Sequence, residues 1–571
     1  MNAATPSSHH PIIPSPHHPP SSTYRVQLNA DFTFADTRTI VPYLARLGIG
    51  ALYTSPFLCA TPGSTHGYDV TDYGSLNPEI GAEDDLHALT DTLRAHGMGL
   101  LVDVVPNHMG IAGGANAWWQ DVLENARTSA YADFFDIDWR PLKEELRGKI
   151  LLPVLGDHYG VVLERGELHL AYADGAFTVH YFETKLPIAP PTYPMILADA
   201  LHHLTDDAAG DALHQDTGAR PTAPSPADAL PSPIAMGEGL GVRAELQSII
   251  TAFERLPPQH EQDPERIAER RREQIVAKRR LADLATSSSD VAHAIAEAVR
   301  TFNGDPAQPY SFDALDRLLD AQSYRLSSFR TAGEEINYRR FFAINELAAV
   351  RQEVPDVFAA AHALLLRLVA GGQVTGLRID HPDGLWDPAG YFRDLQRAAW
   401  DVLNEGGRGG KRGAAARGLR GEGGDRGPNP RALSPPFPPS SLPPFLPLAD
   451  RLPIYLVVEK ILEPGETLPN DWAVHGTVGY EFARLTTGLF VDPAAQRPFD
   501  DRPGQRNQRP GPRPQPHLRA EPPHPRLHPQ RPPPCVARGD YGVPGVPHVR
   551  RLRRVGSRKS EVGGSVSGYA C

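Results

Sequence analysis

Cysteine is scarce in this chain of 571 residues, which has three copies, at Cys59, Cys535 and Cys571. Such widely spaced cysteines exclude a disulfide framework and a zinc-binding spacing, and they are typical of a reducing compartment. The sequence also has no run of about 18 uncharged apolar residues, which excludes a membrane-spanning helix. Residues 1–22 are rich in His, Pro and Ser without an apolar segment, so we expect no signal peptide and a cytoplasmic protein.

Two basic segments of this acidic chain bear on whether it binds nucleic acid. The formal net charge of −11 argues against a general nucleic-acid binder. Residues 501–571 contain 13 Arg and one Lys against four acidic residues, but no aromatic platform accompanies them, so we expect no nucleic-acid partner. The basic run at 270–280 is interspersed with acidic residues, and we interpret it as the solvated face of a helix.

Glycine and proline, with 51 and 58 copies, concentrate in segments that cannot form a packed core. We expect a disordered tail at 1–22, flexibility at 203–235, a low-complexity insertion at 405–450 and an Arg/Pro-rich disordered tail at 491–571. The loss of periodicity near residue 490 is what a reading-frame shift in a GC-rich gene would produce. A genuinely evolved tail is the alternative.

Between these segments, apolar strand-like runs alternate with helical patterns, such as Leu86, Leu89 and Leu93 in the helix expected at 82–96. Apolar strands that alternate with helices predict an α/β fold with parallel strands, either a barrel or a doubly wound sheet. The expected domain boundaries, in chain order, are strands one to three at 23–110, an inserted α+β and helical subdomain at 111–370, strand four with its helix at 371–404, and strand five onward at 451–490.

Polar residues collect where three of the expected strands end. In a parallel barrel, functional side chains lie at the carboxyl ends of the strands. The polar residues at these three ends are, in chain order, Asp103, Asn107, His108, Arg378, Asp380, His381 and Glu459.

The strand ends contain two carboxyl groups in contrasting surroundings. Arg378 and Asp380 share one face of their strand, and the neighbouring cation is expected to lower the pKa of Asp380, as a nucleophile requires. Glu459 ends an apolar strand, where desolvation is expected to raise its pKa, as a general acid requires. Two carboxyl groups with separated pKa values are the signature of glycosidic-bond chemistry.

Taken singly, each of these residues has an ordinary structural interpretation. A lone acid at a strand end more often caps a turn or pairs with a cation. A loop histidine such as His108 is as often structural as functional, and a lone Tyr68 is more often a core residue. Asp103, in mid-strand, is interpreted as the structural partner of Arg378. It is the joint order and spacing that favour a functional site.

Three segments resemble signature regions of the α-amylase superfamily, glycoside hydrolase family 13: DVVPNH at 103–108, GLRIDH at 376–381 and the strand that ends in Glu459. Longer motifs resemble the maltooligosyltrehalose synthases within that superfamily, over roughly residues 22–490. These motifs are YRVQL at 24–28, GSTHGYD at 63–69, EEINYRRFF at 334–342, RIDHPDGL at 378–385, VEKIL at 458–462 and GTVGY at 476–480.

This resemblance implies a (β/α)8 barrel of the TIM type and an intramolecular transglucosylation. The reducing-end α-1,4 bond of a maltooligosaccharide, or of a glycogen-derived α-1,4-glucan, would become an α,α-1,1 bond. Asp380 would be the nucleophile and Glu459 the acid/base, about 5–5.5 Å apart. Tyr68 would stack on the sugar, and His108, Arg378 and His381 would bind its hydroxyls or the nucleophile, with Asn107 as structural support. The resemblance implies no metal or organic cofactor, and we expect a monomer.

The sequence departs from the family after Gly479, where we find no match to its third catalytic carboxylate or to its last barrel strands. We therefore expect an incomplete barrel with a large mixed insert between strands three and four, which helps to close the pocket. We also predict that the polypeptide as written is poorly soluble and inactive. An α-glucan hydrolase of the α-amylase type and a non-catalytic glucan-binding remnant are the alternatives.

Overall fold

The computed structural model describes residues 19–213, 233–308, 310–405 and 452–492. Of the described residues, those up to Glu481 belong to one compact unit and residues 482–492 to a second. Most of each segment expected to be disordered lies outside the described residues. No helix in the described ranges is long and apolar enough to span a membrane.

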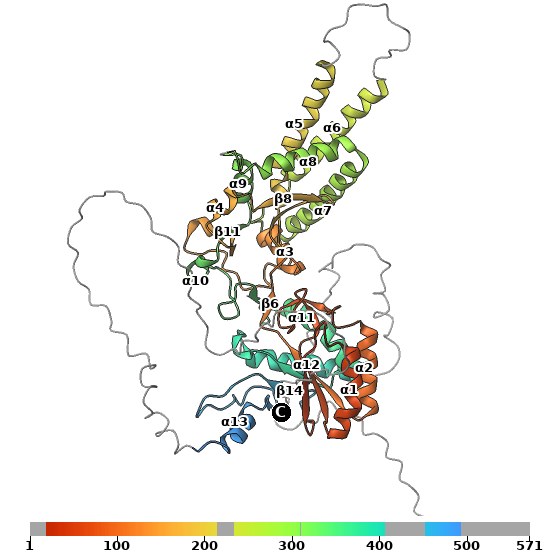
Figure 1. The fold of residues 1–571 in the computed structure, drawn as a ribbon, viewed down its shortest axis with the longest axis vertical. Coiled ribbons are helices and arrows are strands. Elements are labelled where there is room, and N and C mark those ends of the chain that lie inside the picture. Colours follow the sequence, from red (N-terminus) through yellow and green to blue (C-terminus); the bar gives the residue numbers. More distant parts are fainter. Residues whose placement is uncertain (1–18, 214–232, 309, 406–451, 493–571) are drawn as a thin grey trace, which may run out of the picture. The chain divides into compact units, whose positions relative to one another are not determined.

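The first unit contains a six-stranded parallel sheet (Figure 1). Its strands lie side by side in the order in which they occur in the chain. A doubly wound sheet reverses its order at a switch point, whereas a barrel adds each strand beside the last. The strands therefore match six of the eight of a (β/α)8 barrel. They are β1 (Thr23–Val26), β2 (Ala51–Thr54), β5 (Gly99–Val104), β13 (Gly376–Ile379), β14 (Tyr455–Val458) and β15 (Gly476–Thr477).

Helices lie between the first five of these strands in the chain and pack beside the sheet, as Figure 1 shows. Helix α1 begins with a capping box between Thr33 and Asp36 and ends at Gly48, whose φ of 90° suits glycine. The predicted leucine face of α2 is confirmed, because Leu89 is fully buried and its two partners on that face are as well. Burial of each such leucine side chain contributes roughly 1.5–3 kcal/mol to the stability of the folded protein. The helices beside the sheet are α1 (Phe34–Leu47), α2 (Glu83–Ala95), α11 (Pro355–Ala370) and α12 (Pro388–Glu405).

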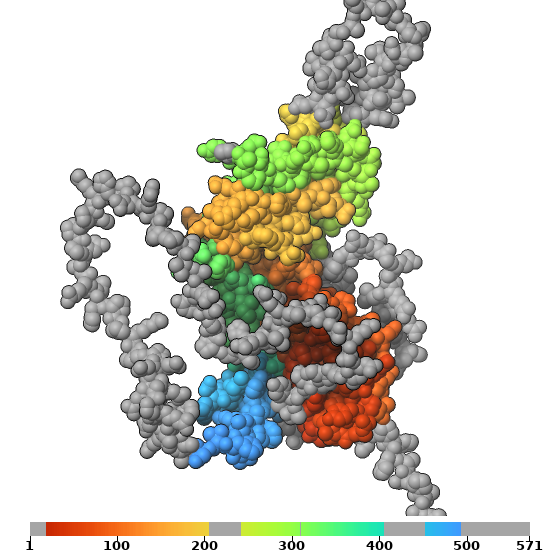
Figure 2. Space-filling view, viewed as in Figure 1, coloured from red at the N-terminus to blue at the C-terminus, as the bar shows by residue number. Residues whose placement is uncertain are grey.

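The chain between β5 and α11 forms its own small sheets and helices. Three of its strands, β8 (His169–Ala173), β9 (Ala176–Tyr181) and β10 (Thr184–Pro187), form an antiparallel sheet. In Figure 2 the green helices at 264–303 lie directly on the orange segment that holds these strands. The longer helices are α5 (Tyr193–Leu213), α6 (Pro233–Glu254), α7 (Pro264–Ser287) and α8 (Ser289–Asn303).

Shorter elements complete the described part of the chain. Strand β6 (His108–Gly110) pairs with β12 (Leu347–Ala349), which joins the end of the insert to the loop after β5. The others are β3 (Leu58–Ala60), β4 (Val70–Leu76), β7 (Ile150–Leu155), β11 (Tyr324–Ser328), α3 (Ala117–Asn125), α4 (Tyr159–Glu164), α9 (Asp313–Asp320), α10 (Ala332–Glu335) and α13 (Tyr480–Gly488).

The basic run on α7 is not wholly a solvated face, which corrects the interpretation made from the sequence. Arg270 is 1% exposed, and Lys278 forms an ion pair with Glu124 of α3. Gln274 donates to the same carboxylate at 3.0 Å. These residues lie one helical turn apart, so polar and charged contacts along α7 add to the apolar packing of its buried Leu281.

Candidate active site

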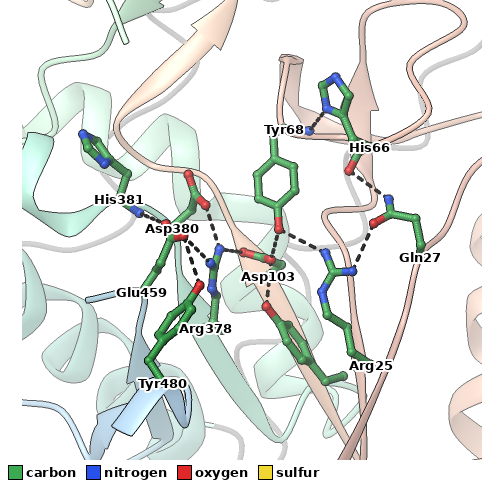
Figure 3. A network of polar contacts seen from close by, with 11 residues as sticks. Arg25, Gln27, His66, Tyr68, Asp103, Arg378, Asp380, His381, Glu459 and Tyr480 are labelled. Carbon is green, nitrogen blue, oxygen red and sulfur yellow. Dashed lines mark hydrogen bonds and ion pairs between the residues drawn. The ribbon is translucent and has the colours of Figure 1, made fainter. Parts of the chain in front are cut away.

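Strand register brings the predicted polar residues to one end of the sheet. Arg378 of β13 lies directly between Asp103 of β5 and Val457 of β14. Asp380 and Glu459 come directly after β13 and β14, so the two carboxyl groups leave neighbouring strands at the same edge. Figure 3 shows both of them beside the Arg378 guanidinium.

Three carboxyl groups share that single guanidinium. Its Nη1 lies 2.6 Å from Asp103 Oδ1 and 2.7 Å from Asp380 Oδ1, and its Nη2 lies 3.3 Å from Glu459 Oε1. The Arg378 side chain is 5% exposed, so water screens these contacts little. The predicted pairing of Asp103 with Arg378 is confirmed, and the guanidinium orients both candidate catalytic carboxylates.

Asp103 is the fully buried anchor of this network. It accepts hydrogen bonds from the hydroxyls of Tyr68, at 2.6 Å, and Tyr53, at 3.0 Å. Arg25 donates to the Tyr68 oxygen at 3.1 Å. Burial raises the pKa of Asp103, while Arg378 and the two phenols oppose that rise. Sequence reasoning missed Tyr53 and the role of Arg25, although Arg25 lies in one of the quoted motifs and Tyr53 in an expected strand.

The expected lowering of the Asp380 pKa is wrong. Burial, together with the neighbouring Asp103 and Glu459 carboxyls, raises the pKa of Asp380 to about 7, although Arg378 acts in the opposite direction. The physical reason is that one cation serves three acids, and the Asp380 side chain is only 8% exposed. Sequence spacing revealed the cation but not the two competing anions.

Glu459 lies in more polar surroundings than the sequence suggested. Its side chain is 30% exposed, whereas that of Asp380 is 8% exposed. Its Oε2 accepts the backbone N–H of His381 at 3.1 Å, and its Oε1 lies 3.4 Å from the Tyr480 hydroxyl. Glu459 therefore has polar contacts at both oxygens and reaches the solvent side of the site.

A cleft of about 570 Å³ opens over Asp380 and Glu459. His108 lines it, and its Nε2 is buried without a hydrogen-bond partner among the described residues. Burial lowers the pKa of His108 to about 4, so the imidazole is neutral at pH 7 and can bind a sugar hydroxyl. The other lining residues are Thr61, His66, Tyr68, Asp69, Ala112, Phe341, Ile344, Glu346, Leu347 and Arg378.

The insert forms part of this cleft through the segment before β12. The Phe341 ring lies 4.2 Å from the His108 ring and 4.9 Å from the His381 ring, between centroids. Burial lowers the pKa of His381. Asn107 does not line the cleft but accepts a hydrogen bond from Arg339 behind it, at 3.1 Å. Within the described ranges, no group of three or more His, Cys, Asp or Glu residues could hold a metal ion.

Comparisons with known proteins agree with this geometry. The family model of the α-amylase catalytic domain matches residues 38–162. Over 487 residues, 84% of the chain, the sequence is 30% identical to a putative maltooligosyl trehalose synthase from Mycobacterium tuberculosis. The chain is a relative of the maltooligosyl trehalose synthases. The resemblance seen in its motifs is thereby confirmed.

A solved structure of a mutant maltooligosyltrehalose synthase from Arthrobacter ramosus supports the same relationship, with 29% identity and a TM-score of 0.50 over 84% of this chain. An intracellular maltogenic amylase from Bacillus subtilis is 36% identical over 118 residues, or 20% of this chain. The chain spans about 40% of the length of the synthases it matches.

Proposed function

We propose that this protein acts on α-1,4-glucans as an intramolecular transglucosylase of the maltooligosyl trehalose synthase type. The observation that carries the proposal is the pair of carboxyl groups, Asp380 and Glu459, which contact opposite ends of the Arg378 guanidinium at the floor of an open cleft. We infer the substrate class from the similarity of the chain to the synthases named above.

In the first step, Asp380 attacks the anomeric carbon of the penultimate glucose, and the α-1,4 bond to the reducing-end glucose breaks. Glu459 donates its proton to the departing oxygen. In the second step, Glu459 takes the proton of the anomeric hydroxyl of the released glucose. That oxygen then displaces Asp380, forming an α,α-1,1 bond with retention. The carboxyl separation of about 5–5.5 Å stays a prediction of this mechanism.

The other predicted site residues would bind the sugar. Tyr68 would stack on the ring before the scissile bond, and His108, Arg378 and His381 would bind its hydroxyls or orient Asp380. Asp380 must lose its proton before it can attack, so the fraction of Asp380 in the attacking form should rise as pH passes about 7.

Incubation of the full chain with maltopentaose tests the proposal. Loss of reducing ends without a change in chain length supports transglucosylation, and Asp380→Asn and Glu459→Gln should abolish it. A gain of reducing ends identifies a hydrolase. Binding of the glucan in calorimetry without turnover supports a non-catalytic glucan-binding remnant and the inactivity expected from the sequence. That expectation depends on residues that lie largely outside the described ranges.

A further inference from the structure

The turn after β13, residues 381–384, has a strained backbone beside Glu459. His381 has φ of 44° and ψ of 55°, in the left-handed region that residues with side chains rarely adopt. Its N–H is the one that donates to Glu459 Oε2, at 3.1 Å (Figure 3). Strain of this kind persists only where surrounding contacts hold it.

Arg339 supplies such contacts from the segment before β12. Its Nη1 donates to the carbonyl oxygen of Gly384 at 2.7 Å and to Asn107 Oδ1 at 3.1 Å, and its Nε donates to Asp136 Oδ2 at 2.8 Å. The Gly384 N–H in turn donates to the His381 carbonyl oxygen at 3.1 Å, which closes the turn. Arg339 therefore joins the loop after β5 to the last residue of the strained turn.

Close packing limits where this turn can move. A Cβ atom on Gly384 would lie 2.5 Å from Asn107 Oδ1 and 2.5 Å from His381 Cδ2. Asp383, inside the turn, pairs with Lys460 at 2.9 Å, next to Glu459 in the chain. The turn is thus fixed to the residues around Glu459 from two sides, by Arg339 and by Lys460.

We propose that Arg339 is a positioning residue for the acid/base. By binding Gly384 and Asn107 together, it holds His381 in the left-handed conformation and keeps the His381 N–H on Glu459. Arg339 acts through the turn and contacts neither carboxylate. This gives a role to the first arginine of the EINYRRFF motif. The effect of Arg339 on acid catalysis rests on the proposed function, whereas its effect on the backbone conformation of His381 does not.

Two substrates with different leaving groups separate acid positioning from general damage. Departure of fluoride from α-maltotriosyl fluoride needs no proton, whereas departure of phenol from phenyl α-maltotrioside depends on the acid. With Arg339→Met, we expect kcat/KM for the phenyl substrate to fall about tenfold to a hundredfold, and fluoride release to change less than about threefold. Equal losses on both substrates would overturn the proposal.

Two matched variants complete the kinetic test. Arg340→Met removes the same charge from the next residue, whose guanidinium binds Ala343 and Asn345 instead of the turn. It should leave the ratio of the two rates unchanged, and a ratio that shifts as in Arg339→Met would contradict the assignment. Arg339→Lys, which can still donate to the Gly384 carbonyl, should recover part of the phenyl activity.

A crystal structure of Arg339→Met decides the conformational part even without turnover. We expect His381 to leave the left-handed region and its N–H to lose Glu459. An unchanged turn overturns the proposal. If the wild-type chain releases neither fluoride nor phenol, the proposed function fails, and the crystal structure alone decides whether Arg339 holds the turn.

Discussion

Replacement of Asp380 by asparagine should stabilise the folded protein above neutral pH while it removes the nucleophile. The pKa of Asp380 rises from 3.8 to about 7 on folding, chiefly through burial. Between these values the folded protein binds more protons than the unfolded chain, so its free energy of unfolding falls as pH rises. At 1.36 kcal/mol per pKa unit, the full cost of ionising Asp380 in place is roughly 4 kcal/mol.

Urea unfolding of the full chain at two pH values measures this cost. Asparagine does not ionise. The free energy of unfolding of Asp380→Asn should therefore exceed that of the wild type by about 2–4 kcal/mol near pH 8 and by about 1 kcal/mol near pH 4.5. Asp394→Asn, at a carboxylate 56% exposed, is the control and should change stability by less than about 0.5 kcal/mol at both pH values. Destabilisation by Asp380→Asn near pH 8, or a difference independent of pH, would refute the reasoning.

Three further predictions concern the residues around the site and the buried face of α2. Asp103→Asn should remove the buried carboxylate that orients Arg378 and the Tyr68 and Tyr53 hydroxyls, and should abolish turnover of maltopentaose; turnover at the wild-type rate would show that Asp103 is dispensable. The His108 imidazole should titrate near pH 4 by NMR, and glucan affinity measured by calorimetry should not vary with its protonation between about pH 6 and 8. Leu89→Ala should lower the free energy of unfolding by about 2–5 kcal/mol, whereas Leu47→Ala, at a side chain 53% exposed, should have little effect.

Much of this architecture could be predicted because periodicity reports on burial. The apolar runs that end at Asp103 and near Asp380 are central strands of the sheet, and the leucine face of α2 is buried as its spacing predicts. The motifs identified the residues that the register then brings together around Arg378. The interpretation of Asp103 as the structural partner of Arg378, made from the sequence, is confirmed across two neighbouring strands.

The sequence could not reveal how many groups from distant segments surround one charged side chain. The pKa of Asp380 is raised first by burial and then by Asp103 and Glu459, which are 277 and 79 residues away in the chain, so its direction was predicted wrongly. Arg270 is buried for a comparable reason, since its surroundings come from a distant segment. The pairing of β6 with β12, and with it the position of Arg339, likewise depends on long-range contacts that no local pattern indicates.

Identification of the residue that bonds to the sugar tests the central claim most directly. Incubation of the full chain with a slow-turnover fluorinated α-glycosyl fluoride, followed by peptide mapping by mass spectrometry, should find the label on Asp380 and none in Asp380→Asn. A label on Asp103, Glu459 or any other residue, or no label on a chain that binds the glucan, would contradict the assignment of Asp380 as the nucleophile.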